Sequence, residues 1–272
     1  MDTKLQPVLS AGAEPREVYQ ALTEYQHAED FKRLDFIVKQ VQSLQKPDVT
    51  IMDIGCGNGN IARVLGGFGY SVLGVDIDPE SIAEARKRNA FPNVRFEQMD
   101  AESLPTAGEF DVLVCSEVLE HLDVPGSLVE TAYRLLKPGG RLIVTVPNGH
   151  GPREVLMTKP MQWINKKGYG DWLVTVKRSL GYANATSQSS NPDLTHIQFF
   201  SRTSLEALLK KHGFRPVTFA KANFIDRVFP YSLLANRLYP LQRLDCRLAD
   251  LLPTNCASGF YTCWQKPVSP LY

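Results

Sequence analysis

Three glycines in the first third of the chain have the spacing of a nucleotide-binding loop. Residues 50–60 read TIMDIGCGNGN, so a short apolar run is followed by Gly55, Gly57 and Gly59. The run is typical of a strand buried on both faces, and the glycines allow a sharp turn and a close approach of the backbone to a ligand. Helical spacing of apolar residues begins at Ile61. The stretch therefore predicts a strand, a ligand-binding loop and a helix in succession.

An acidic residue follows at the distance expected of a ribose contact. Asp76 ends the next apolar run, residues 71–75, and lies about 20 residues after Gly55. A nicotinamide dinucleotide is therefore one candidate ligand. Its fingerprint, however, requires Gly or Ala three positions after the second glycine, where this chain has Asn60. The Gly-Lys-Ser/Thr sequence of a phosphate-binding loop does not follow either.

A block of acidic residues with histidine comes directly after a predicted strand over residues 110–116. Glu117, Glu120 and His121 would share one face of a helical turn that began there, and His196 is a fourth candidate. Carboxylates and imidazoles are suitable ligands for a divalent cation such as Mg²⁺. In the alternative interpretation no metal is bound, Glu120 is a solvated helix residue, and either histidine accepts a proton near neutral pH.

Predicted strands and helices alternate around these residues. This alternation indicates a parallel sheet covered by helices on both faces. Further strands are expected over residues 94–98, 141–147, 214–219 and 258–265, and further helices over residues 128–136 and after an N-cap at Ser201.

Five blocks in this order resemble class I S-adenosylmethionine (SAM) methyltransferases. They are DIGCGNG at 53–59, VDID at 75–78, QMDA at 98–101, FDVLVC at 110–115 and LKPGG at 136–140. The resemblance covers residues 47–148 and extends to residues 196–220. It implies an α/β fold with a Rossmann-like seven-stranded, mostly parallel sheet, helices on both faces and two helical insertions. It also implies that the last two strands run antiparallel to the rest.

The resemblance implies SAM as cofactor and a set of residues that bind it. Asp53 would organise the loop and favour a positive group, Asp76 would accept both ribose hydroxyls, Ile77 and Met99 would enclose the adenine, and Asp100 would accept its exocyclic amine. The full set is Asp53, Gly55, Gly57, Gly59, Asp76, Ile77, Met99, Asp100, Ala101 and Cys115.

The acidic block resembles two groups of O-methyltransferases. One group acts in ubiquinone biosynthesis, and the other methylates the terminal ribose of small RNAs. In both, the resemblance implies a metal that binds the acceptor oxygen and lowers its pKa. The ligands would be Glu117, Glu120, His121 and His196.

The resemblance and the composition together divide the chain into six segments. They are an N-terminal helical cap (1–46), the SAM-binding core (47–148), an insertion that forms a substrate lid (149–195), a core helix and strand (196–220), a leucine-rich helical insertion (221–257), and the final strand and tail (258–272). The aromatic residues of the first insertion could alternatively serve packing alone. Arginines in the second insertion could contact anionic lipid or an acidic substrate, or form the solvated side of a packed helix. A dimer interface is a further possibility.

The composition limits the classes of function. A net charge of +1 argues against a strongly basic nucleic-acid-binding protein. Five cysteines without paired CxxC spacing indicate free thiols in a reducing compartment. The sequence shows neither a signal-type segment nor a run of about 20 apolar residues. A cytoplasmic enzyme is therefore expected, and the sequence does not indicate its oligomeric state.

The sequence favours a SAM-dependent methyltransferase that acts on a hydroxyl of a small or lipid-like molecule, such as a quinone, polyketide or glycan precursor. The alternatives are methylation of an RNA ribose 2′-hydroxyl and N- or C-methylation of a small molecule. A SAM-sensing or scaffold protein is a third, non-enzymatic hypothesis, which the intact glycines and acidic residues argue against.

Overall fold

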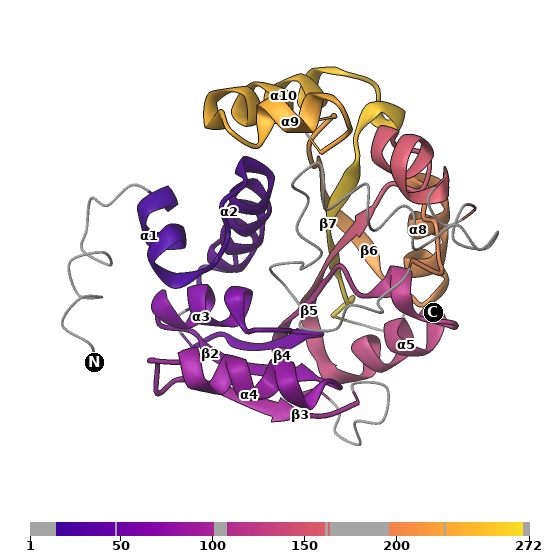
Figure 1. Cartoon of the computed structure of the whole chain (residues 1–272). Coiled ribbons are helices and arrows are strands. Elements are labelled where there is room, and N and C mark those ends of the chain that lie inside the picture. The colour runs from indigo at the N-terminus through magenta and orange to yellow at the C-terminus, as the bar shows by residue number, and fades with distance from the viewer. Residues whose placement is uncertain are drawn as a thin grey trace.

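The computed structural model describes residues 15–46, 48–100, 108–160, 163, 196–225 and 227–268. Within them, seven strands form one sheet in the order β3-β2-β1-β4-β5-β7-β6 (Figure 1). The strands are β1 (Thr50–Ile54), β2 (Ser71–Asp76), β3 (Val94–Gln98), β4 (Phe110–Ser116), β5 (Leu136–Pro147), β6 (Arg215–Lys221) and β7 (Gly259–Gln265).

The helices lie on both faces and at one end of the sheet (Figure 1). They are α1 (Pro15–Leu22), α2 (Ala28–Gln42), α3 (Asn60–Gly67), α4 (Pro79–Arg88), α5 (Pro125–Leu135), α8 (Arg202–Lys211), α9 (Tyr231–Ala235) and α10 (Tyr239–Leu251). The described residues also include the 3-10 turns η2 (Leu119–His121) and η4 (Thr254–Cys256) and the π-helical segment η3 (Glu154–Thr158).

The strand directions confirm the predicted fold class and correct one detail of it. β1 is parallel to β2 and β4, and the parallel pairing continues to β3 on one side and β5 on the other. β7 is antiparallel to both of its neighbours, β5 and β6. Consequently β6 runs in the same direction as β1 to β5. The expectation that both of the last strands are antiparallel is right for β7 and wrong for β6.

Alternate side chains of the central strand β4 are buried in two different apolar clusters. Val112 and Val114 of β4 face the cluster that includes α2 and α3, whereas Leu113 and Cys115 face the cluster that includes α5 and α8. A strand covered by helices on both faces is mostly apolar along its length, which explains the continuous apolar run over residues 112–115. The strand order reverses between β1 and β4, and open α/β sheets bind ligands at that point.

Helix starts follow local capping chemistry. Asp78 accepts the N–H groups of Glu80 and Ser81 and so caps α4, and Ser201 forms a capping box with Ser204 at the start of α8. α5 begins earlier than predicted, at Pro125, because proline is favoured in the first turn of a helix. β5 also begins earlier than predicted and includes the LKPGG block.

The two predicted insertions are described to different extents. The leucine-rich insertion contains α9 and α10, as predicted, and α10 packs on α2. Of the predicted lid, residues 149–160 and 163 are described, and the remaining residues lie outside the described ones. No helix in the described part of the chain is both long and apolar enough to cross a membrane.

Asp111 joins the starts of three neighbouring strands. Its Oδ2 accepts hydrogen bonds from the N–H of Thr50 at 3.0 Å and from Nζ of Lys137 at 2.9 Å, and its Oδ1 accepts one from Nζ of Lys46 at 2.6 Å. Burial alone would raise the pKa of Asp111, but these hydrogen bonds outweigh it and hold the pKa well below its usual range. The ionised carboxylate therefore stabilises the fold.

We predict that Asp111→Asn lowers the free energy of unfolding at pH 7 by about 1–3 kcal/mol. A carboxyl whose pKa is depressed in the folded state stabilises above its unfolded pKa of about 4 and loses this effect as the pH falls. The difference between the two proteins should therefore shrink between pH 7 and pH 3, measured by urea denaturation. Asp35→Asn is the control, because its pair with Lys39 is exposed and should contribute less than about 1 kcal/mol. An equal loss at both pH values would contradict the prediction.

Candidate functional site

The glycine loop follows β1 at the carboxyl edge of the sheet. Gly55, Gly57 and Gly59 have φ values of 65°, 50° and 76°, a region that side-chain-bearing residues rarely adopt. A Cβ at Gly55 would lie 2.4 Å from Cγ2 of Val118, and a Cβ at Gly59 would lie 2.5 Å from Cζ of Phe96. At these two positions the backbone can therefore reach its place only as glycine.

Asp76 connects the glycine loop to the end of β2. Its Oδ2 accepts the N–H of Gly57 at 2.8 Å, and its Oδ1 accepts the N–H of Asp78 at 2.9 Å. The side chain is half-buried. Each carboxylate oxygen has a second lone pair, so both can still accept a hydroxyl from a ligand.

The other predicted cofactor residues occupy neighbouring strand ends. Ile77 follows β2 and is 70% exposed, which leaves an apolar side chain uncovered at this edge. Met99 is half-buried and Asp100 is exposed, both directly after β3. Cys115 pairs with Ile54 across β1 and β4, and its side chain is buried in the core. Ala101 lies outside the described residues.

Asp53 is a buried acid beneath the glycine loop. It is 1% exposed, and within the described residues neither of its carboxylate oxygens accepts a hydrogen bond of ordinary geometry. Burial, with a smaller contribution from the charge of Asp76, raises the pKa of Asp53 to about 8. A buried carboxyl that accepts no hydrogen bond of ordinary geometry fits a site that receives a positively charged or hydrogen-bond-donating group.

Glu117 begins the acceptor block in a strained conformation. Its φ is 58°, which is uncommon for a residue with a side chain. Its N–H donates to the Thr145 carbonyl at 2.9 Å, the Thr145 hydroxyl donates to its Oε1 at 2.9 Å, and Arg33 Nη1 lies 3.8 Å from the same oxygen. The helical turn consequently begins at Leu119. The expected helical face shared by Glu117, Glu120 and His121 does not form.

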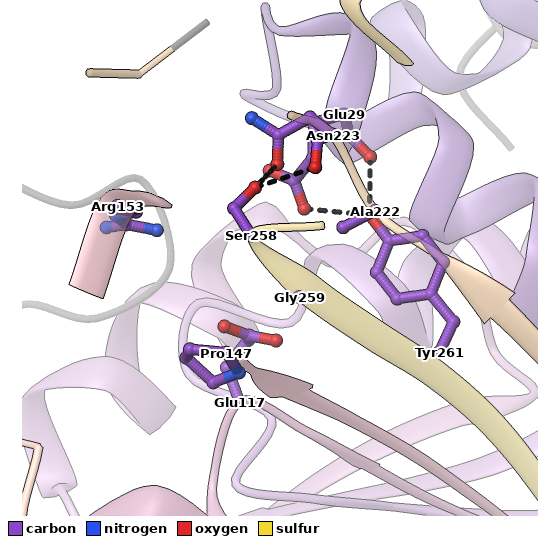
Figure 2. A pocket seen from close by; sticks show the side chains of 9 residues that line it. All are labelled: Glu29, Glu117, Pro147, Arg153, Ala222, Asn223, Ser258, Gly259 and Tyr261. Atoms are coloured by element: carbon purple, nitrogen blue, oxygen red, sulfur yellow. Dashed lines mark hydrogen bonds between the residues drawn. The ribbon is translucent and has the colours of Figure 1, made fainter. Parts of the chain in front are cut away.

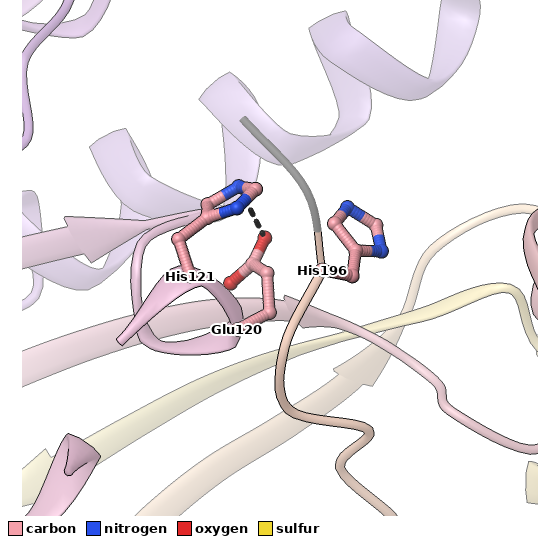
Figure 3. A group of neighbouring side chains, drawn as sticks. All are labelled: Glu120, His121 and His196. Atoms are coloured by element: carbon pink, nitrogen blue, oxygen red, sulfur yellow. Dashed lines mark ion pairs between the residues drawn. The ribbon is translucent and has the colours of Figure 1, made fainter. Parts of the chain in front are cut away.

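Three of the four predicted metal ligands lie together nonetheless. Glu120, His121 and His196 each offer one ligand atom, and these atoms lie within 4.8 Å of one another (Figure 3). Nε2 of His121 is 3.8 Å from Oε1 of Glu120, and the two imidazole centroids are 5.2 Å apart. Glu117 is not part of this group.

Hydrogen bonds to the main chain of Glu120 place His196 in this group. Its carbonyl accepts the N–H groups of Ile197 at 2.8 Å and Gln198 at 2.9 Å. The Glu120 side chain is 1% exposed, and neither of its carboxylate oxygens has a hydrogen-bond partner within the described part of the chain. Burial and the neighbouring charge of Glu117 raise the pKa of Glu120 well above its ordinary value.

Glu154 is a site residue that the sequence did not reveal. It begins η3, is 1% exposed, and has its Oε1 3.3 Å from Nδ1 of His196. Burial alone would raise the pKa of Glu154, but His196 lowers it below the ordinary value. No spacing in the sequence marks Glu154, because its partner is more than 40 positions away and the intervening residues include the insertion.

A polar pocket adjoins Glu117 at the ends of β5 and β7 (Figure 2). Glu29 forms one wall, where its Oε1 accepts the Tyr261 hydroxyl at 2.8 Å and its Oε2 lies 2.9 Å from Nη2 of Arg227. Burial would raise the pKa of Glu29, but Arg227 and Arg33 outweigh it and lower the pKa to about 2. The pocket is lined by Glu29, Glu117, Pro147, Arg153, Ala222, Asn223, Ser258, Gly259 and Tyr261.

We predict that Asp53→Asn flattens the pH dependence of stability of the ligand-free protein. A carboxyl whose pKa is raised on folding stabilises the fold while it is protonated, and this contribution is lost as the pH rises from about 4 to about 8. Between pH 5 and pH 7 the wild-type free energy of unfolding should fall faster than that of Asp53→Asn, by about 1.4 kcal/mol per pH unit. Urea denaturation at several pH values measures both slopes. Parallel slopes would show that Asp53 ionises normally.

Comparison with known proteins gives the family of the chain. A family model described as "Methyltransferase domain" matches residues 22–218. A ubiquinone biosynthesis O-methyltransferase of Thiobacillus denitrificans is 33% identical over 134 residues, which are 47% of this chain and 58% of that protein. The protein of the same name from Pseudomonas aeruginosa is 36% identical over 105 residues, or 36% of this chain and 44% of that protein. The chain thus spans about half the length of the curated relatives it matches.

Solved structures show the same fold. A SAM-dependent methyltransferase from Methanosarcina mazei aligns with a TM-score of 0.53 at 22% identity and covers 84% of this chain and 97% of its own. A putative sarcosine dimethylglycine methyltransferase from Galdieria sulphuraria aligns with a TM-score of 0.57 at 14% identity and covers 91% and 93%. With the family model matching well over half of its residues, the chain belongs to the methyltransferase domain family of class I SAM-dependent methyltransferases.

Proposed function

We propose that this chain transfers the methyl group of SAM to a hydroxyl of a small or lipid-like molecule, such as a quinone, polyketide or glycan precursor, with a divalent cation such as Mg²⁺ at the acceptor. One observation carries the proposal. The buried carboxylate of Glu120 has no hydrogen-bond partner among described residues, yet two imidazoles lie beside it. The relatives named as ubiquinone biosynthesis O-methyltransferases support oxygen as the acceptor atom.

The residues around the glycine loop fit SAM. The cofactor supplies a methyl group already activated by its sulfonium, so the protein's task is to hold and align the reactants. Asp76 would accept the ribose hydroxyls with its two oxygens, and the exposed Ile77 would lie against the adenine. Asp100 would accept from the adenine amine. The buried carboxyl of Asp53 would favour the positive end of the cofactor.

The acceptor end fits a divalent cation. Such a cation supplies a positive charge that lowers the pKa of a hydroxyl. Glu120, His121 and His196 would hold it, since a buried carboxylate and imidazoles are ligands that such ions accept. Glu117, also a predicted ligand, contacts Thr145 and Arg33 instead. Glu154 lies behind His196 and would orient its ring. The role of residues 149–195 as a lid remains a prediction.

The contact between Glu154 and His196 also favours a second mechanism for the same reaction. Nδ1 of His196 lies 3.3 Å from a carboxylate oxygen of Glu154, and in this mechanism the other ring nitrogen, Nε2, would accept the proton of the acceptor hydroxyl. A carboxylate that orients an imidazole and stabilises its charged form is a common arrangement for a general base. In this mechanism no cation is required.

We predict that Asp76→Ala lowers the affinity for S-adenosylhomocysteine at least tenfold, because two charge-assisted hydrogen bonds are lost. Isothermal titration calorimetry measures the affinity. Asp76→Asn, which keeps one acceptor oxygen, should bind with intermediate affinity. Glu80→Ala, an exposed change on the neighbouring helix, is the control and should bind as the wild type does. Unchanged binding by Asp76→Ala would remove this residue from the cofactor site.

Chelation distinguishes the two mechanisms. We predict that removing divalent cations lowers methyl transfer from labelled SAM to acceptors in a cell extract about 100-fold or more, and that added Mg²⁺ restores it. Glu120→Gln should have the same effect and should also weaken binding of Mn²⁺, followed by electron paramagnetic resonance. Glu130→Gln, an exposed change on α5, is the matched control.

The opposite pattern would support the metal-free mechanism. Chelation and Glu120→Gln would then leave turnover largely intact, whereas Glu154→Gln would lower kcat and shift the pH–rate profile. If neither chelation nor either substitution lowered turnover while the cofactor still bound, the methyl acceptor would bind away from Glu120 and His196.

A further inference from the structure

The helical insertion over residues 221–257 presents apolar side chains to the outside. Figure 1 shows α9 and α10 as a layer beyond α2 at one end of the molecule. Six leucines on α9, on α10 and in the turn between them are exposed, and we call them the leucine face. They are Leu233 (41%), Leu234 (53%), Leu238 (45%), Leu244 (50%), Leu248 (41%) and Leu251 (84%).

Hydrogen bonds on the inner side of α10 hold this orientation. The buried residues of the helix are Gln242, Asp245, Cys246 and Ala249, two of which are polar. Oε1 of Gln242 accepts the N–H of Ala28 at 2.9 Å, and its Nε2 donates to the Ala235 carbonyl at 2.9 Å. Asp245 accepts the N–H groups of Phe224 at 2.7 Å and Ile225 at 3.0 Å.

A rotation of α10 that buried its leucines would break these bonds and leave buried polar groups unpaired, which is costly. The outward leucines are therefore a consequence of how the inner side is bonded. Leu244, Leu248 and Leu251 follow helical spacing and therefore share one exposed side of α10. Exposed apolar patches mark interaction surfaces.

The charges around the leucine face are positive. Arg243 and Arg247 are exposed and lie next to Leu244 and Leu248, so the two arginines form their own row one position away along the helix. Arg237 is exposed at the end of α9. The acidic residue on the outer side of α10, Asp250, is paired with Lys32 at 2.8 Å.

A row of leucines flanked by arginines is the pattern of a helix that lies in a membrane interface. Arginine side chains can extend past apolar surface and keep their charge at the level of the phosphates. A protein partner with an apolar surface could cover the leucines, but the arginine row would then need acidic groups in register with it. An anionic bilayer offers acyl chains to the leucines and phosphates to the arginines. Its lipids can move, so no fixed spacing of acidic groups is required.

We propose that the leucine face binds the surface of an anionic membrane, with the leucines at the boundary between headgroups and acyl chains and with Arg237, Arg243 and Arg247 near the lipid phosphates. This surface is independent of the methyl-transfer chemistry proposed above. It would keep the enzyme at a bilayer whichever acceptor it uses.

Sedimentation of the full chain with lipid vesicles tests the proposal. We expect binding to vesicles of phosphatidylcholine mixed with phosphatidylglycerol, and binding at least about tenfold weaker to phosphatidylcholine alone. Leu244→Asp/Leu248→Asp should reduce binding to the anionic vesicles about tenfold or more. Arg243→Gln/Arg247→Gln should reduce it by several-fold and should remove most of its dependence on salt.

A matched double substitution controls for the added negative charge. Val124→Asp/Val268→Asp changes two valines that are also exposed, 64% and 75%, but lie away from α9 and α10, and this protein should bind as the wild type does. Thermal melting should show all variants folded, because each changed side chain is exposed. Sedimentation velocity at several concentrations is run in parallel.

Three outcomes would overturn the proposal. The first is that the wild type does not bind the anionic vesicles. The second is that the leucine variant binds them as the wild type does. The third is a concentration-dependent dimer that the leucine substitutions dissociate while no protein binds vesicles, which would make the leucine face an interface between two copies of the chain.

Discussion

The contact between the glycine loop and the segment after β4 connects both halves of the site. The space for a side chain at Gly55 is occupied by Val118, which directly follows Glu117 and precedes η2. The loop that would carry the cofactor and the turn that carries Glu120 and His121 are thus in van der Waals contact. This proximity follows from the strand order, because β1 and β4 are neighbours at the point where the order reverses. A change in either segment must therefore move the other.

Two buried carboxyls mark the two ends of this site. Asp53 lies beneath the glycine loop and Glu120 lies after β4, and within the described residues neither has hydrogen-bond partners for its oxygens. A buried polar group without a partner destabilises the folded protein, so ligands that supply donors or positive charge at these points would stabilise it by mass action. Two other buried acids, Asp245 and Glu29, accept N–H groups or pair with arginine instead. Asp245 and Glu29 therefore stabilise the fold, whereas Asp53 and Glu120 could each contact a ligand.

Ion pairs around Glu117 connect the site to α2 and to the helical insertion. Arg33 on α2 lies near both Glu117 and Asp30, and Arg227 from the insertion pairs with Glu29 and Asp30. These ion pairs connect α2 to the strand ends on one side and to the insertion on the other. The insertion is therefore anchored through its buried polar residues. That leaves its leucines free to face outward.

The sequence by itself determined those features that depend on residues close together in the chain. The buried strand before Gly55, the spacing to Asp76 and the cap at Ser201 could all be read from it, because glycine conformations, strand burial and capping depend on neighbouring residues. The tertiary structure decided the rest. A left-handed Glu117 held by Thr145 and Arg33 removed that residue from the expected helical face, and hydrogen bonds from Ile197 and Gln198 to Glu120 brought His196 to His121. The position of Glu154 and the outward turn of the leucines likewise depend on partners distant in the chain, such as His196 and the N–H groups that Asp245 accepts. The pattern of leucines and arginines does not by itself say which side of the helix is buried. The hydrogen-bond partners of the inner side determine this.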